Sequence, residues 1–149
     1  MAYNLKFQPN PESSISDSDY LARFLANGFE AREGSNCFHN PGLGVIRMTN
    51  GTEQIPPSAV VYVGFTSKVW NEEDFRPIVD KWLQLAELTD SIVYDRGTCI
   101  PLDNERTISD CVARIAARRQ ACFKGGPTLV VKDDYFETRR NPEEGGHGL

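Results

Sequence analysis

The chain has few of the residues on which catalytic sites commonly depend. Only two histidines occur in its 149 residues, and one of them, His147, lies close to the C-terminus. The other, His39, lies in the segment CFHNPG, whose composition predicts a loop. A Cys37–His39 dyad would need an orienting group that the sequence does not supply, so His39 is interpreted as a surface residue. No catalytic residue is expected.

The sequence also lacks the common motifs for metals and cofactors. It contains no His-Glu-x-x-His, no calcium-loop pattern and no complete glycine-rich phosphate loop. Its four cysteines show no Cys-x-x-Cys spacing, and we therefore expect no metal site and no cofactor. Two of them fall on the apolar side of a predicted helix and are interpreted as core residues, whereas the other two lie in less regular segments: Cys111 and Cys122, then Cys37 and Cys99.

No apolar run is long enough to span a bilayer, and the first 14 residues lack the apolar segment of a signal peptide. We therefore expect a cytoplasmic protein that does not contact membranes. The net charge of −5 makes nucleic acid an unlikely partner, because nonspecific binding to nucleic acid depends on neutralising phosphates. The same charge is compatible with a basic protein partner. The oligomeric state is left open.

The clearest secondary structure lies in residues 59–88. Residues 59–65 are mostly β-branched or aromatic, which predicts a strand buried on both faces. A helix is predicted to begin at Asp74, with Pro77 tolerated in its first turn. Apolar residues then recur at three- and four-residue steps and form one stripe: Phe75, Ile78, Val79, Trp82, Leu85 and Ala86. This segment predicts the core of a compact α+β domain.

Weaker patterns predict the remaining elements. We expect strands at 4–8 and 44–49, and a short helix capped by Ser16 lies between them and ends at Asn27-Gly28. A hairpin with strands 91–94 and 98–102 around a three-residue loop follows the long helix. A third helix is predicted to begin at Thr107, and a final strand at 128–136.

These elements predict an α+β fold with a mainly antiparallel sheet and about three helices. The first six follow the order strand, helix, strand, strand, helix, strand, which is that of the ferredoxin-like split βαβ arrangement, here elaborated by the later elements. Residues 1–140 are interpreted as a single domain, and residues 141–149 as a flexible C-terminal tail.

The connector between the strongest strand and the long helix is the first candidate for a partner-binding surface. Trp70 lies in it, and an exposed tryptophan in a connector is a typical interface anchor. The alternative is that Trp70 caps the core at the strand end. Polar neighbours would form its rim, so the predicted partner-binding residues are Lys68, Trp70, Asn71, Glu72 and Glu73.

Arg114, Arg118 and Arg119 form the strongest positive cluster and are an alternative anion-binding site. The first two share one face of the predicted helix, and the third is displaced by about 100°. The favoured interpretation of this cluster is a solvated helix face that pairs with carboxylates, because no aromatic residues are interleaved with it.

The lead functional hypothesis is a small non-enzymatic protein-binding domain. Its size, acidity and lack of catalytic motifs are typical of a cognate inhibitor, such as a toxin-immunity protein or a phage-encoded antagonist. The alternative is a small-ligand or nucleotide-binding domain, or an enzyme with an unusual site, that uses the arginine cluster or the Asp95-Arg96 hairpin. An RNA-binding ferredoxin-like module is a third reading, disfavoured by the acidic balance.

Overall fold

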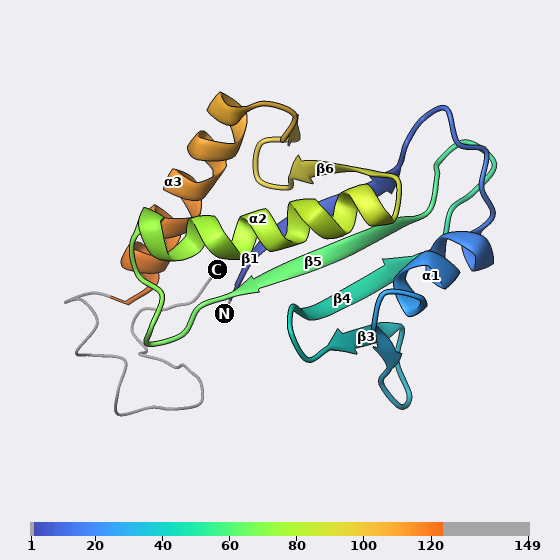
Figure 1. Ribbon diagram of the computed structural model, residues 1–149, viewed down its shortest axis with the longest axis horizontal. Coiled ribbons are helices and arrows are strands. Elements are labelled where there is room, and N and C mark those ends of the chain that lie inside the picture. The colour runs from blue at the N-terminus through green and yellow to red at the C-terminus, as the bar shows by residue number, and fades with distance from the viewer. Residues whose placement is uncertain (1, 124–149) are drawn as a thin grey trace.

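The computed structural model describes residues 2–123 and contains ten helices and strands in this range (Figure 1). The predicted strand at 128–136 and the predicted tail at 141–149 lie outside the described residues. The strands are β1 (Ala2–Pro9), β2 (Glu30–Ala31), β3 (Cys37–Asn40), β4 (Gly44–Thr49), β5 (Ser58–Gly64), β6 (Ser91–Asp95) and β7 (Ile100–Pro101). The helices are α1 (Asp17–Leu25), α2 (Glu72–Leu88) and α3 (Glu105–Cys122).

All seven strands form one antiparallel sheet in the order β2-β3-β4-β5-β1-β6-β7. The predicted α+β class, with an antiparallel sheet and three helices, is confirmed. The four longest strands follow the order β4-β5-β1-β6, so the first strand of the chain lies between two strands that come much later. This order is compatible with the split βαβ arrangement, and the assignment to that fold stays a prediction.

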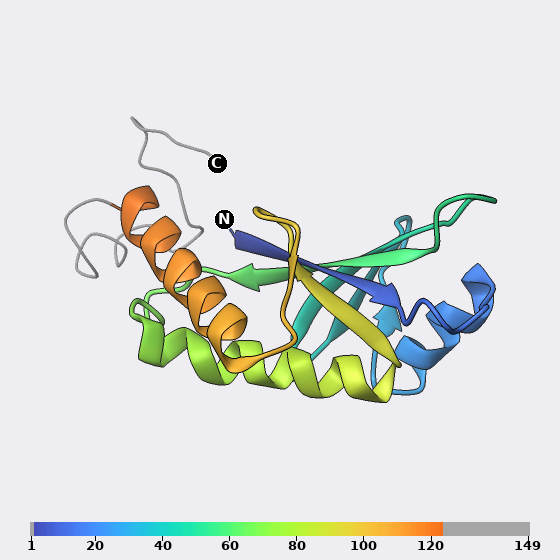
Figure 2. The same ribbon diagram turned by 90° about the horizontal axis from the view of Figure 1, so that it is seen from above.

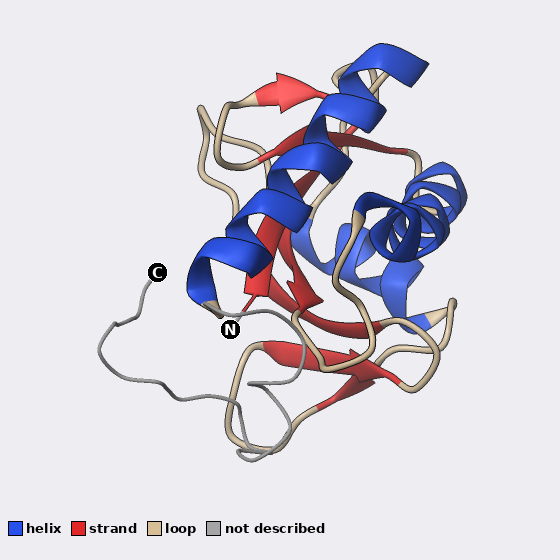
Figure 3. Cartoon of the chain, turned by 90° about the vertical axis from the view of Figure 1, so that its left-hand side faces the viewer, coloured by secondary structure: helices blue, strands red, loops and turns tan. Residues whose placement is uncertain are grey.

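Helices α1 and α2 lie on the same face of the sheet, as Figure 2 shows, and α3 packs against α2 (Figure 3). Alternate residues of β1 point into this covered face, where Phe7 meets the ring of Phe24 from α1 and that of Trp82 from α2. Trp82 is fully buried and also packs on Phe29. Burying each such side chain contributes about 2–3 kcal/mol, so this layer is the core of the domain.

The prediction that the long helix begins at Asp74 is wrong by two residues. Helix α2 begins at Glu72 after the cap residue Asn71, and Asp74 is its third residue. The Asp74 carboxylate reaches back and accepts hydrogen bonds from the backbone N–H groups of Trp70 and Asn71, both at 3.0 Å. These bonds lower the pKa of Asp74. A carboxylate at the third helical position can therefore stabilise the start of a helix by accepting backbone hydrogen bonds, as a side chain at the cap position would.

The start predicted for the third helix is wrong for a similar reason. Helix α3 begins at Glu105, and Asn104 caps it by accepting a hydrogen bond from the backbone N–H of Thr107 at 3.0 Å. Helices α2 and α3 are also joined by an exposed two-bond ion pair, in which Arg76 donates to both carboxylate oxygens of Glu105 at 2.6 and 2.8 Å.

The segment around His39 is a strand and not the loop that its composition predicts. Residues 37–40 form β3, in which Phe38 is buried and His39 is exposed opposite Val45. The turn residues that suggested a loop close the β3–β4 connection, where Asn40 accepts from the backbone N–H of Gly42 at 2.8 Å. The predicted three-residue hairpin loop is likewise longer, since β6 ends at Asp95 and β7 begins at Ile100.

Candidate binding face

The predicted connector surface is exposed except for its tryptophan. Lys68, Asn71, Glu72 and Glu73 are exposed, and Trp70 is half-buried against the core. The guanidinium carbon of Arg119 lies 3.7 Å from the centre of the Trp70 ring. Arg119 also donates hydrogen bonds to the backbone oxygens of Val69 and Thr66, at 3.3 and 2.7 Å. Trp70 therefore closes one end of the core and keeps part of its ring at the surface.

The structure does not bring the three predicted anion-binding arginines together. Arg119 is fully buried beneath Trp70. Arg114 points the other way and forms a two-bond ion pair with Asp95, at 2.7 and 2.8 Å. Arg118 is exposed, with its guanidinium carbon 5.6 Å from the centre of the Tyr3 ring. Each guanidinium group thus has its own environment, and two of them are already held by groups of the protein.

Asp95 is the centre of a buried polar cluster that sequence reasoning did not find. Its carboxylate has no exposed surface and accepts hydrogen bonds from the Tyr3 hydroxyl at 2.7 Å and the Gly97 backbone at 2.9 Å, besides those from Arg114. Burial raises the pKa of Asp95, but these hydrogen bonds outweigh it and hold the pKa below its ordinary value. A Cβ at Gly97 would lie 2.9 Å from the Tyr3 hydroxyl, so this turn requires glycine.

Two groups beside Asp95 have pKa values above their ordinary ones. Burial, followed by the Asp95 carboxylate, raises the pKa of Tyr3 to about 12 and that of Cys111 to about 12. Both groups therefore stay protonated at neutral pH. Because every oxygen of Asp95 is engaged and the Cys111 thiol is fully buried, the cluster anchors α3 to the sheet and has no reactive group at the surface.

The other face of the sheet carries a row of side chains on which no helix of residues 2–123 packs (Figure 2). Strand register places Arg47 beside Val60, Val60 beside Lys6, and Lys6 beside Tyr94, so these four residues cross β4, β5, β1 and β6. Tyr62 lies two residues beyond Val60 on the same face. We call this surface the open face and define it by Lys6, Gln8, Arg47, Tyr62 and Tyr94.

The open face leaves its polar groups without partners inside the described part of the chain. Within residues 2–123, no hydrogen bond or ion pair engages the side chain of Lys6 or Arg47, or the hydroxyl of Tyr62 or Tyr94. The Nε atom of Arg47 is buried and still unpartnered in this range. Val60 is buried between Lys6 and Arg47, whose long stems can cover an apolar neighbour. The face thus combines two cations with two aromatic rings.

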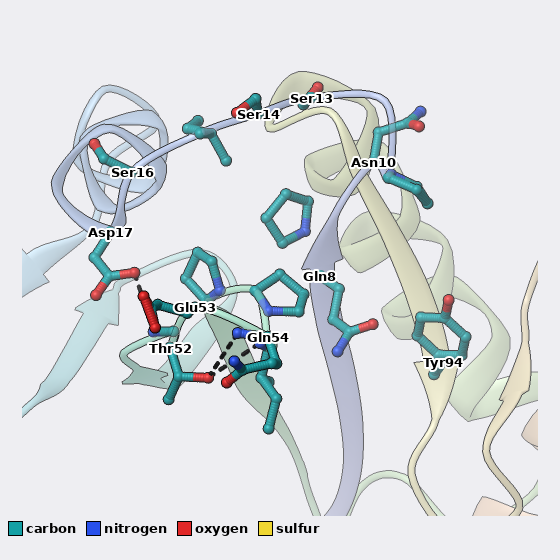
Figure 4. A pocket seen from close by; sticks show the side chains of 17 residues that line it. Gln8, Asn10, Ser13, Ser14, Ser16, Asp17, Thr52, Glu53, Gln54 and Tyr94 are labelled. Carbon is teal, nitrogen blue, oxygen red and sulfur yellow. Dashed lines mark hydrogen bonds between the residues drawn. The ribbon is translucent and has the colours of Figure 1, made fainter.

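Two hollows adjoin each other on the open face, and we refer to them together as the groove. The larger, which we call the loop hollow, has a volume of about 610 Å³ and lies between the loops 10–16 and 50–57 (Figure 4). The smaller, the strand hollow, has a volume of about 400 Å³ and is lined by Lys6, Arg96 and Cys99, among others. Gln8 and Tyr94 line both, so the two hollows are neighbours that share these two residues.

Hydrogen bonds hold the walls of the loop hollow in place. Asp17, at the start of α1, accepts from the backbone N–H of Gly51 in the opposite loop at 3.0 Å. Ser13 donates to the Asp90 carboxylate at 2.8 Å, and the Asn10 backbone donates to the Asp90 carbonyl at 2.9 Å. Four prolines restrict the same walls: Pro9, Pro11, Pro56 and Pro57. The loop hollow is therefore pre-formed.

Neither a metal site nor a membrane span is present among the described residues. No group of three or more histidine, cysteine, aspartate or glutamate side chains is placed to hold an ion, and no helix in residues 2–123 is long and apolar enough to cross a bilayer. No protein-family model matches the chain, and no curated protein or solved structure shows significant similarity to it. The functional argument therefore depends on the geometry of the surfaces.

Proposed function

We propose that this chain is a protein-binding domain and that the open face is the surface that contacts its partner. The observation that carries the proposal is the set of unpartnered side chains on this face, Lys6, Arg47, Tyr62 and Tyr94, beside a groove whose loop hollow is pre-formed. The non-enzymatic inhibitory role and the cytoplasmic location expected from the sequence belong to the same proposal.

Tyrosine and arginine are enriched among the residues that contribute most to protein–protein binding. A tyrosine ring brings a large contact area at little cost in side-chain entropy. The cations Lys6 and Arg47 flank Val60, and this arrangement is complementary to acidic side chains of a partner. Because neither cation is paired within residues 2–123, a partner carboxylate displaces no internal ion pair there.

One observation favours small-ligand binding as a second candidate function. The loop hollow has about 610 Å³, which is within the usual range for ligand pockets. A thermal-shift screen of the full chain against nucleotides and common metabolites tests this candidate. A ligand whose stabilisation disappears in Tyr94→Ala would support it, and the absence of any stabilising compound would contradict it.

Selection from a random-peptide display library, followed by NMR with the strongest peptide, tests protein binding. We expect enriched peptides, and we expect the bound peptide to shift the amide signals of Lys6, Arg47, Tyr62 and Tyr94. Shifts confined to the connector residues 68–73 would reassign the partner site to the surface predicted from sequence. The absence of any enriched peptide would contradict the proposal.

A further inference from the structure

The charges that line the groove change sign between its two ends. The strand hollow contains the cations Lys6 and Arg96, and the one carboxylate there, Asp95, is already paired with Arg114. The loop hollow contains the carboxylates Asp17 and Glu53, and its described lining includes no lysine or arginine. The groove therefore has a basic end and an acidic end.

The acidic end offers carboxylates that no cation of the described chain neutralises. Within residues 2–123, neither Asp17 nor Glu53 forms an ion pair, and the one hydrogen bond of the Asp17 side chain comes from the backbone N–H of Gly51. Figure 4 shows both residues on the side of the hollow away from Gln8 and Tyr94. Pro56 and Pro57 line the same hollow and can pack against the aliphatic stem of a lysine or arginine.

The change in the sign of the charge along the groove distinguishes between two classes of linear ligand, nucleic acid and polypeptide. A nucleic acid strand carries a negative charge at every phosphate, so a strand bound along the groove would place phosphates beside Asp17 and Glu53. A polypeptide can carry an acidic side chain at one point and a basic one a few residues later. The groove is complementary to the polypeptide.

The length of the groove sets the spacing of these charges. From Lys6, at the basic end, to Asn10, on the wall of the loop hollow, the chain advances four residues, or about 13 Å at about 3.3 Å per residue, which is a lower bound for a segment that also reaches Asp17 and Glu53. An extended partner segment would cross the same distance in about four residues. Gln8 and Tyr94 lie between the two ends, where they would contact the middle of the segment.

We infer that the groove binds an extended segment of a partner protein, with an acidic side chain beside Lys6 and Arg96 and a basic side chain in the loop hollow beside Asp17 and Glu53. This inference rests on the proposed function and adds the charge order of the bound segment. It follows from the juxtaposition of the two hollows on one sheet face.

Two synthetic peptides test the inference directly. They share one sequence except that a glutamate and an arginine, separated by at least about four residues, exchange places. Fluorescence anisotropy with the full chain should show that one peptide binds about tenfold more tightly than the other. The double variant Arg96→Glu/Glu53→Lys should abolish this preference, because each end then carries one cation and one carboxylate; both substituted residues are exposed and lie in loops.

Lys81→Glu is the matched control, since Lys81 is exposed on α2 away from the groove and its substitution should leave both affinities unchanged. Equal affinities of the two peptides for the wild type, or a preference that persists in the double variant, would overturn the charge order. Binding of displayed peptides to the open face without such a preference would overturn this inference alone. Tight binding of single-stranded oligouridine that Lys6→Glu abolishes would replace the polypeptide with a nucleic acid.

Discussion

The two faces of the sheet differ in whether their tyrosine hydroxyls have hydrogen-bond partners. On the covered face, Tyr3 donates to Asp95, and the Tyr20 hydroxyl is hydrogen-bonded to Ser91 at 2.6 Å. On the open face, the hydroxyls of Tyr62 and Tyr94 have no partner within residues 2–123. Within the described residues, the covered face therefore completes its polar contacts, whereas the open face leaves these hydroxyls available to the partner that we propose.

The largest expected difference between the faces comes from removing an aromatic side chain. Trp82→Ala should lower the free energy of unfolding by about 4 kcal/mol, because it leaves a cavity among Phe7 and Phe29. Tyr94→Ala, on the open face, should cost less than about 1 kcal/mol. Chemical denaturation measures both. Similar losses for the two variants would remove the contrast between the faces.

A second prediction concerns Asp95, the buried carboxylate on the covered face. Asp95→Asn should cost about 2 kcal/mol at neutral pH, because the charge that accepts from Tyr3 and Arg114 is lost. The folded protein holds the pKa of Asp95 below its ordinary value of 3.8, so this contribution is present above pH 3.8 and disappears as the pH falls through the lowered value. Denaturation curves of wild type and variant across this range should converge in acid. A constant difference would contradict the role of the charge.

Removing a single hydroxyl gives a smaller and closely matched comparison. Tyr3→Phe should cost about 1.5 kcal/mol, because it removes a hydrogen bond to a charged group. Tyr62→Phe should change the free energy of unfolding by less than about 0.5 kcal/mol, since its hydroxyl has no partner in the described chain. Thermal unfolding of both variants makes the comparison, and a larger loss for Tyr62→Phe would contradict it.

Thiol labelling compares the exposure of the two faces of the sheet in the unmutated protein. Cys99 is exposed and Cys37 is half-buried on the open face, whereas Cys111 is fully buried with a pKa raised to about 12. Burial also raises the pKa of Cys122. A maleimide at neutral pH should therefore label Cys99 first and Cys111 last, as mass spectrometry of the folded protein would show. Early labelling of Cys111 would show that the covered face opens.

The sequence predicted the parts of the fold that depend on local periodicity. The apolar stripe of α2 and the alternation in β1 repeat within a few residues, and Ser16 caps α1 as expected. The wrong predictions for β3 and for the helix starts arose because the residue types concerned occur in more than one structural role. Turn residues after His39 concealed β3, and carboxylate or amide caps moved the starts of α2 and α3 by two residues.

The candidate site could not be predicted in the same way. Arg47, Lys6 and Tyr94 become neighbours only through strand pairing over long separations. The alternation of polar and apolar residues in β1 indicates an outward face but does not show which side chains share it. The arginine cluster shows the same limit, because closeness in α3 suggested a shared anion site only as an alternative and could not name the contacts of each arginine. Arg114 and Arg119 instead contact Asp95 and Trp70, far away in sequence.

One charge reversal at three lysines tests the central claim most directly. Lys6→Glu on the open face, Lys68→Glu on the connector and Lys81→Glu on α2 make the same chemical change on three surfaces. Affinities for the strongest library-selected peptide, measured by fluorescence anisotropy, should fall about tenfold for Lys6→Glu and stay unchanged for the other two. Loss of affinity in Lys68→Glu with full affinity in Lys6→Glu would contradict the assignment of the partner site to the open face.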